Sequence, residues 1–134
     1  MRAERRRDGS WEDVCSVDDL LPNTGVACLV SGHQVALFRV GSEHAFYAVD
    51  NFDPFSRANV IARGIVGCRS GRPKVASPMY KQSFCLQSGA CLDDPSVSLE
   101  VFQVSVEGRR VLVRASATHK LRFRNPELVS DRGA

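Results

Sequence analysis

The sequence has no long apolar run. No stretch approaches the roughly 18 apolar residues of a transmembrane helix. No apolar segment follows the basic residues 1–8 in the way that a secretory signal requires. We therefore expect a cytoplasmic protein that has no membrane partner.

Residues with the spacing of metal ligands are also missing. The five cysteines, at positions 15, 28, 68, 85 and 91, are scattered without a C-x-x-C, and the three histidines lie apart from one another. A zinc or iron–sulfur site needs clustered thiolates or imidazoles, so we expect no bound metal. Cys85 and Cys91 flank a turn at Gly89 and could approach disulfide distance. Without an export signal, however, we predict five free thiols.

The chain also lacks the residue patterns of catalysis and of nucleic-acid binding. It contains no Ser/His/Asp arrangement, no phosphate-binding loop and no paired carboxylates of catalytic type. Its net charge is +3, but residues 1–9 and 115–134 each carry two more basic than acidic residues, which leaves −1 for residues 10–114. A nucleic-acid site is normally a basic face of the folded part. We expect no nucleic-acid partner and no catalysis by this chain alone.

What the sequence does contain is a succession of short strand-like runs. They are rich in Val and Phe and are separated by Gly, Ser and Asp, a pattern typical of antiparallel all-β domains. The runs are 11–14, 26–30, 34–38, 45–49, 65–68, 74–76, 101–106 and 111–113. Residues 31–33 and 70–73 have the length and composition of hairpin turns. We predict one all-β domain over residues 10–114, an antiparallel β-sandwich or small barrel, between a basic N-terminal tail (1–9) and a polar C-terminal tail (115–134).

Helical signal is confined to two single turns. Ser16 followed by Asp19 three residues later has the form of a capping box. A second turn is expected within residues 55–63. Arg63-Gly64 then indicates a turn before the next strand, in which Gly64 would supply a positive φ.

Two segments that directly follow strands do not fit the strand pattern. They are 51–56 (N-F-D-P-F-S) and 77–84 (S-P-M-Y-K-Q-S-F). Each contains a proline, which biases the preceding residue toward an extended conformation, and each places aromatic and polar groups together at a strand end. They are either ordinary surface loops, where such residues collect, or binding loops.

The order of these parts resembles the Rieske domain, whose two loops, Cys-x-His and Cys-x-x-His, hold an iron–sulfur cluster. The second loop of that family often reads C-P-x-H-x-x-x-F followed by Leu, Gly and Pro. The resemblance implies a Rieske-like fold with two loops at one end. Here the four ligand positions hold Asn51, Asp53, Ser77 and Tyr80. Because a Rieske centre needs two thiolates and two imidazoles, we expect no cluster and no other cofactor in this chain.

A narrower resemblance is to the small subunit of assimilatory NAD(P)H-dependent nitrite reductase. It rests on Asn-x-Asp-Pro-Phe at 51–55 together with Ser-Pro-x-x-Lys-Gln at 77–82, and it covers residues 10–114. It implies a non-redox accessory subunit in nitrate assimilation that docks on a large catalytic subunit. Flavin, iron–sulfur and sirohaem centres in that partner would reduce nitrite to ammonium. Two alternatives stay open: a free-standing Rieske-like binding or scaffold domain of another oxidoreductase, and a Rieske-type electron-transfer ferredoxin.

Four loop residues are candidates for the surface that meets this partner. They are Asp53, Phe55, Tyr80 and Lys81. Phe55 and Tyr80 would be anchors, because aromatic side chains often carry much of the binding energy, and Asp53 and Lys81 would form a charged rim. Asp53 could instead initiate a turn, and Phe55 could fill the core.

Overall fold

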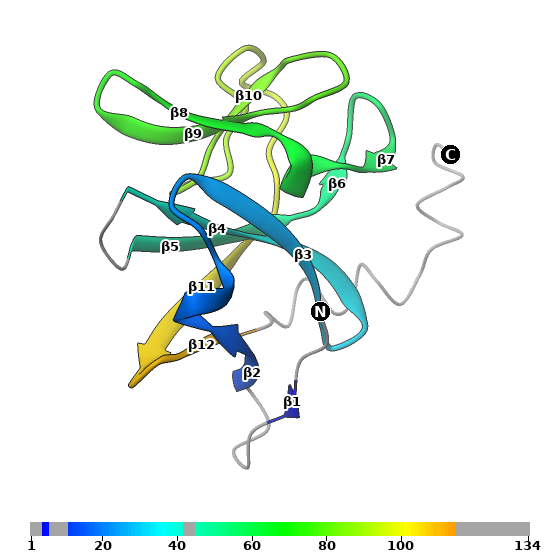
Figure 1. Ribbon diagram of the computed structural model, residues 1–134. Helices are drawn as coiled ribbons and strands as arrows, with labels where there is room; N and C mark the ends of the chain where they lie inside the picture. The colour runs from blue at the N-terminus through cyan, green and yellow to red at the C-terminus, as the bar shows by residue number, and fades with distance from the viewer. Residues whose placement is uncertain (1–3, 6–10, 42–44, 115–134) are drawn as a thin grey trace.

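The computed structural model describes residues 4–5, 11–41 and 45–114, and their regular structure is mainly strand (Figure 1). In chain order the elements are β1 (Glu4–Arg5), β2 (Trp11–Ser16), η1 (Val17–Asp19), β3 (Thr24–Val30), β4 (His33–Val40), β5 (Ala45–Asp50), β6 (Phe52–Asp53), β7 (Ala58–Asn59), η2 (Ile61–Arg63), β8 (Ile65–Arg69), β9 (Arg72–Ala76), β10 (Ser83–Cys85), β11 (Val101–Glu107) and β12 (Arg110–Arg114). Every pairing between these strands is antiparallel. The predicted antiparallel all-β fold is confirmed.

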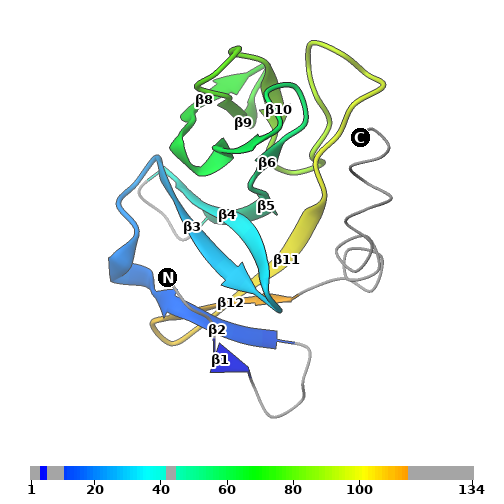
Figure 2. The same cartoon turned by 90° about the vertical axis from the view of Figure 1, so that its right-hand side faces the viewer.

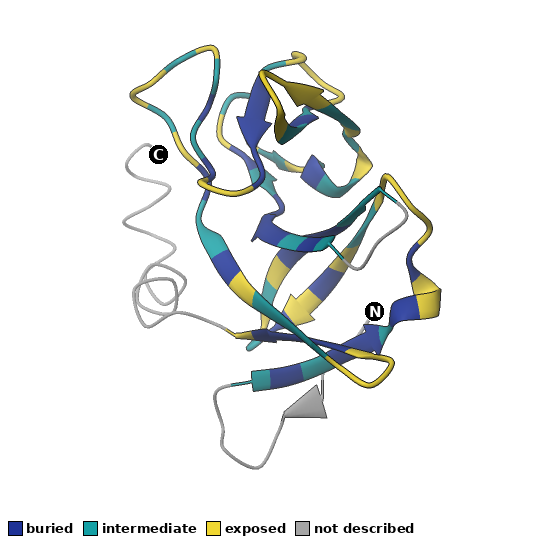
Figure 3. Cartoon of the chain, turned by 90° about the vertical axis from the view of Figure 1, so that its left-hand side faces the viewer, coloured by how far each residue is buried: buried dark blue, intermediate teal, exposed yellow. Residues whose placement is uncertain are grey.

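Seven of the strands form one curled sheet, in the order β1-β2-β12-β11-β5-β4-β3. Its strands differ in how they are buried, since β4 has four consecutive buried residues whereas the end of β3 alternates between buried and exposed residues (Figure 3). In β3, Cys28 and Val30 are buried whereas Ala27 and Leu29 are exposed, so an apolar run in the sequence is a two-sided strand in the fold. The buried side chains form a first core inside the curl, with Leu37 and Val111 among its members.

The remaining strands and their loops form a second layer, which we call the loop lobe (residues 51–99). It contains the three-stranded sheet β10-β9-β8 and the two-stranded sheet β6-β7, and it lies over one end of the curled sheet (Figures 1 and 2). A second core, which includes Ile61, Val75 and Phe84, fills the space between them. Strand β4 separates the two cores, since Leu37 belongs to the first and Phe38 to the second.

The hairpin turns and the first helical turn have the expected local chemistry. The φ values are 53° at Ser31 and 80° at Gly32 in the first hairpin turn. In the second hairpin turn they are 55° at Ser70 and 78° at Gly71. Two successive positive φ values are what a two-residue hairpin turn favours. The capping box of η1 is present, with the Ser16 N–H donating to Asp19 Oδ2 at 2.9 Å. The second predicted turn is η2, at the end of the 55–63 segment.

The prediction of a positive φ at Gly64 is wrong, because its φ is −72° and its ψ is 171°. Glycine is required there for space. A Cβ at this position would lie 2.5 Å from the carbonyl oxygen of Ala76 and 2.6 Å from Cγ2 of Val75. The close approach of β8 to β9, which sequence spacing does not reveal, explains the residue.

Four short strands of the structure, β1, β6, β7 and β10, are not among the predicted runs. Strand β1 lies within the range assigned to the N-terminal tail and pairs with β2. The C-terminal tail (115–134), His119 and His44 lie outside the described residues. No helix in the described part of the chain is long and apolar enough to cross a membrane.

Candidate functional site

The two loops meet within the loop lobe through the buried side chains of Asp53 and Ser77. Ser77 Oγ donates a hydrogen bond to Asp53 Oδ2, and the two residues are 1% and 0% exposed, respectively. A buried carboxylate oxygen without a partner would be costly, and the serine hydroxyl satisfies it. This pair joins segments that are 24 residues apart in the sequence. Two of the four ligand positions of a Rieske domain are thus bonded to each other.

Within the first loop, the segment D-P-F-S-R at 53–57 is a five-residue turn built by Asp53. Its Oδ1 accepts the N–H of Phe55 at 2.9 Å, and its carbonyl oxygen accepts the N–H of Arg57 at 2.7 Å. Arg57 closes the turn with a left-handed φ of 61°. Asp53 therefore does form the Asx-type turn that was its structural alternative.

Within the second loop, the segment S-P-M-Y-K at 77–81 forms the same kind of turn. Ser77 Oγ accepts the N–H of Met79 at 3.3 Å, and its carbonyl oxygen accepts the N–H of Lys81 at 3.0 Å. Lys81 has a φ of 66°, the counterpart of Arg57 in the first loop. Both five-residue turns thus begin with a buried polar residue before proline and end with an exposed basic residue in the left-handed conformation.

The side chain of Asn51 forms hydrogen bonds with the curled sheet and with η2. Its Nδ2 donates to Gln34 Oε1 at 2.9 Å, and its Oδ1 accepts the N–H of Ala62 at 2.8 Å. The residue is 2% exposed. It therefore ties the start of the first loop to β4 and η2.

The tip of the second loop faces solvent. Tyr80 is 60% exposed and Met79 is 52% exposed, and Lys81 beside them is exposed as well. Phe55 is only partly exposed, and its ring centroid lies 6.1 Å from that of Phe84 in the second core. Met79 was not singled out from the sequence, although its position between Pro78 and Tyr80 at a loop tip could have indicated it.

The placement of Asp53 on a charged rim has to be corrected. The side chain is fully buried and accepts hydrogen bonds from Ser77 and Phe55. Its carboxylate is therefore not available at the surface of the domain. The exposed charges of the two turns are both positive, on Arg57 and Lys81.

Charge is divided unequally between the two layers. The loop lobe holds six basic residues, Arg57, Arg63, Arg69, Arg72, Lys74 and Lys81, against three acidic ones, which gives +3. The described residues 11–41, 45–50 and 100–114 hold four basic and seven acidic residues, which gives −3 with histidine neutral. The nearly neutral total of the domain conceals this polarity. One end of the domain, the end that carries both loops, is basic.

The side chains at the ligand positions do not fit a [2Fe–2S] cluster. Such a cluster needs thiolates and, in Rieske centres, imidazoles. Asn51 and Ser77 offer neutral oxygens that are already hydrogen-bonded, and Tyr80 is mostly exposed to solvent. Within the described residues there is also no group of three or more His, Cys, Asp or Glu side chains that could hold a metal ion.

The five cysteines lie away from both loop tips and are free thiols in the structure. Phe84 pairs with Cys91, and the N–H of Cys85 donates to the carbonyl of Ala90 at 2.9 Å. Cys85 and Cys91 therefore point to opposite faces of this pairing, which opposes a disulfide between them. Burial raises the pKa of Cys15 to about 11 and that of Cys28 to about 12. Only Cys68 is exposed.

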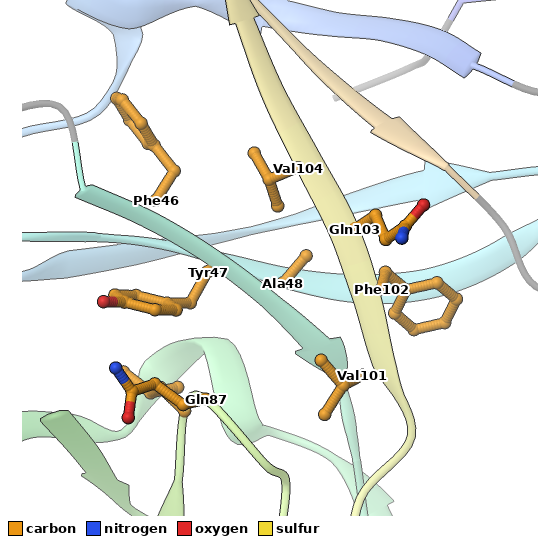
Figure 4. A pocket seen from close by; sticks show the side chains of 9 residues that line it. Phe46, Tyr47, Ala48, Gln87, Val101, Phe102, Gln103 and Val104 are labelled. Atoms are coloured by element: carbon orange, nitrogen blue, oxygen red, sulfur yellow. The ribbon is translucent and has the colours of Figure 1, made fainter. Parts of the chain in front are cut away.

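A separate cleft of about 390 Å³ opens between β5 and β11 (Figure 4). The two strands pair only at Val101↔Val49 and Phe102↔Ala48, and then diverge. The cleft is lined by Phe46, Tyr47, Ala48, Leu86, Gln87, Val101, Phe102, Gln103 and Val104. None of these nine side chains is charged at neutral pH, so the cleft contains no acid–base pair for catalysis.

Comparison with known families agrees with the fold and the loop geometry. The model of a family described as the Rieske-like [2Fe-2S] domain matches residues 10–114. The chain belongs to this family. Within the Rieske-like family it belongs with the nitrite reductase small subunits. It is 39% identical over 104 residues to the nitrite reductase (NADH) small subunit of Salmonella typhimurium, a match that covers 78% of this chain and 96% of the relative.

Two further relatives place this Rieske-like domain in different contexts. A crystal structure from Mycobacterium tuberculosis, assigned to an NADH-dependent nitrite reductase small subunit, has a TM-score of 0.76 and 48% identity, and the match covers 80% of this chain and 96% of that one. The nitrite reductase [NAD(P)H] large subunit of Klebsiella oxytoca is 37% identical over 103 residues, which are 77% of this chain but 11% of that protein. A domain of this kind is thus part of a large-subunit chain in Klebsiella.

Proposed function

We propose that this chain is the accessory small subunit of an NAD(P)H-dependent nitrite reductase, that it docks on a large catalytic subunit, and that it carries no cluster. The centres that reduce nitrite to ammonium (flavin, iron–sulfur and sirohaem) then belong to the large subunit. The observation that carries the non-redox role is the buried Ser77–Asp53 pair, whose hydroxyl and carboxylate stand at two ligand positions and satisfy each other. We place the protein in the cytoplasm and in nitrate assimilation.

The Klebsiella large subunit supports the choice of partner. It holds a related domain within the same chain as the rest of the large subunit. Covalent linkage keeps two parts of an enzyme at a high effective concentration, and a tight interface can replace it when the parts are separate chains. A small subunit on its own chain would therefore need a docking surface.

We infer that this surface is the loop end of the domain. Three of the five exposed large apolar side chains belong to the loop lobe, namely Ile65, Met79 and Tyr80. The exposed side chains of Arg57 and Lys81 stand at matching positions of the two turns. Apolar anchors with charges around them are typical of protein–protein interfaces. We assign Tyr80 as the main anchor, Lys81 as a rim charge, and Phe55 as a partly buried support.

Binding of loop variants to the large subunit of the same organism tests this proposal. Tyr80→Ala should weaken the complex about 30-fold or more, because truncating an interface anchor typically costs ~2 kcal/mol or more. Lys81→Ala should mainly slow association and reduce its salt dependence. The control is Arg114→Ala, at the end of β12 and outside the loop lobe.

The folding of each variant needs to be checked by circular dichroism. Tyr80 is a better probe than Phe55, because Phe55 packs near Phe84 and its loss would also lower stability. If Tyr80, Met79 and Lys81 can all be replaced by alanine with no change in binding or in nitrite reduction, the docking face lies elsewhere. Stable association with a different oxidoreductase would favour the scaffold alternative, and a two-iron visible spectrum would favour the ferredoxin alternative.

A further inference from the structure

Strand β8 is a free edge of the three-stranded sheet in the loop lobe. The sheet order is β10-β9-β8, so β8 pairs with β9 on one side only (Figure 2). The hairpin closes with Arg69 opposite Arg72, and the register places Gly67 opposite Lys74. In a two-residue hairpin, the pair next to the turn, here Arg69 and Arg72, is hydrogen-bonded, and every second pair after it is hydrogen-bonded too. The backbone N–H and C=O groups that point toward β9 are therefore those of Arg69, Gly67 and Ile65. Val66 and Cys68 direct theirs outward.

These outward backbone groups have no hydrogen-bond partner within the part of the chain that the structure describes. No strand of the described residues covers this side of β8. Strand β8 contains no proline, and Ile65 at its start is 74% exposed. An exposed edge with unpaired N–H and C=O groups is a template for a further strand.

The charges around this edge indicate what kind of strand it accepts. Residues 63–76 contain four basic residues, Arg63, Arg69, Arg72 and Lys74, and no acidic one. Arg69 lies 3.8 Å from Asp93, and both of these side chains are about half exposed. Arg63, Arg72 and Lys74 form no ion pair with another residue that the structure describes. A second copy of this chain would bring the same positive charges against them, so pairing of β8 with itself is disfavoured.

The edge is continuous with the loop surface described above. Ile65, the first residue of β8, is opposite Ala76, which directly precedes the second loop at Ser77. A partner seated on Tyr80 and Met79 would therefore reach the start of β8. The two surfaces share one basic end of the molecule.

We propose that an extended, acidic segment of the large subunit adds to β8 as a fourth strand of this sheet. The inference rests on the proposed function, because the large subunit is the partner that it requires. The backbone groups of Val66 and Cys68 would pair with the incoming strand. Arg63 and Arg72 would contact its carboxylates.

The accessibility of the Cys68 thiol can be measured in the wild-type complex without any substitution. Cys68 is exposed on this edge, and the other four cysteines of the chain are buried. The rate at which N-ethylmaleimide alkylates Cys68 is measured with and without an excess of the large subunit, followed by mass spectrometry of the labelled peptide. We expect alkylation to slow at least about tenfold in the complex, because a bound strand would cover the edge. An unchanged rate in a complex that has been shown to form would overturn the inference and leave the proposed function standing.

Three variants test the backbone pairing directly. Cys68→Pro removes the outward N–H together with the thiol, whereas Cys68→Ala removes the thiol and keeps the N–H. The matched control is Ala27→Pro on β3, an exposed position on the edge of the curled sheet whose register also directs the backbone outward. With folding verified by circular dichroism, Cys68→Pro should weaken binding about tenfold or more. Cys68→Ala and Ala27→Pro should bind as the wild type does.

Charge reversal tests the acidic nature of the added strand. Arg63→Glu and Arg72→Glu should slow association and lower its salt dependence, while Arg114→Glu outside the lobe should not. If the reversals leave binding unchanged, the segment is not acidic. Protection of Cys68 at high concentration of this chain alone, together with a dimer in sedimentation, would show that a second copy covers the edge and would overturn the inference. Failure to form any complex with the large subunit would overturn the proposed function, and this inference with it.

Discussion

Replacing Ser77 by alanine is the most direct test of the bond that joins the two loops. The change removes the hydroxyl that donates to Asp53 Oδ2 and that accepts the N–H of Met79. Asp53 is fully buried, so water does not readily replace the lost donor. The Met79 N–H belongs to an exposed loop tip and can be solvated. The loss of stability should therefore come mainly from the carboxylate.

The magnitude follows from the cost of leaving a buried, charged acceptor without its partner. A hydrogen bond to a charged group contributes ~1.5–3 kcal/mol, and the unpaired oxygen adds a desolvation penalty. We expect Ser77→Ala to lower the free energy of unfolding by ~2–4 kcal/mol. For a domain of about 100 residues, this corresponds to a fall in melting temperature of roughly 10–20 °C.

Urea unfolding followed by circular dichroism measures this loss. The matched control is Ser96→Ala, because Ser96 Oγ also donates to an aspartate, Asp94, at 2.7 Å, but on the surface. That control should leave the unfolding midpoint unchanged within error, since water can replace the hydroxyl. Combining Ser77→Ala with Asp53→Asn should cost less than the sum of the single changes, because the charge that needs the hydroxyl is gone. If Ser77→Ala is as mild as Ser96→Ala, the Asp53–Ser77 pair does not hold the loops together.

Three further results are expected. Protein purified anaerobically with iron and sulfide should be colourless. A stoichiometric two-iron spectrum would contradict the proposal that the two loops hold no cluster. Gly64→Ala should destabilise the fold by ~1–3 kcal/mol, because the added methyl meets the Ala76 carbonyl, whereas Gly67→Ala, whose nearest neighbour is 3.7 Å away, should be mild in denaturant titrations. Alkylation of the native protein without reductant should modify Cys68 rapidly and the four buried cysteines only after unfolding, and a protected pair after unfolding would reveal a disulfide.

The strands could be predicted from sequence because their signal is local. Period-two alternation and turn residues such as Ser70-Gly71 depend on neighbours in the chain. The four missed strands, β1, β6, β7 and β10, are two or three residues long and carry too few positions for a pattern. The prediction of a positive φ at Gly64 was wrong for a related reason. Gly64 is required because β9 leaves no room for a Cβ, and β9 is a different segment of the chain.

The positions of the candidate site could also be predicted, but the environment of each side chain could not. The replaced ligands at 51, 53, 77 and 80 are visible in the sequence. The sequence gives no indication that Asp53 is buried against Ser77 while Tyr80 is in solvent. The sequence therefore predicts an exposed Asp53 carboxylate, whereas the hydrogen bond from Ser77 and the burial of Asp53 exclude it from the surface.

The sequence by itself determined the all-β class, the turn chemistry and the absence of cysteine and histidine at the ligand positions. These depend on residue type and short-range spacing. Only the tertiary structure decided that the two loops repeat one turn, that a serine–aspartate pair joins them, and that the basic residues gather on one layer with a free strand edge. Burial, pairing and surface charge depend on which distant segments meet, and this is fixed when the loop lobe packs on the curled sheet.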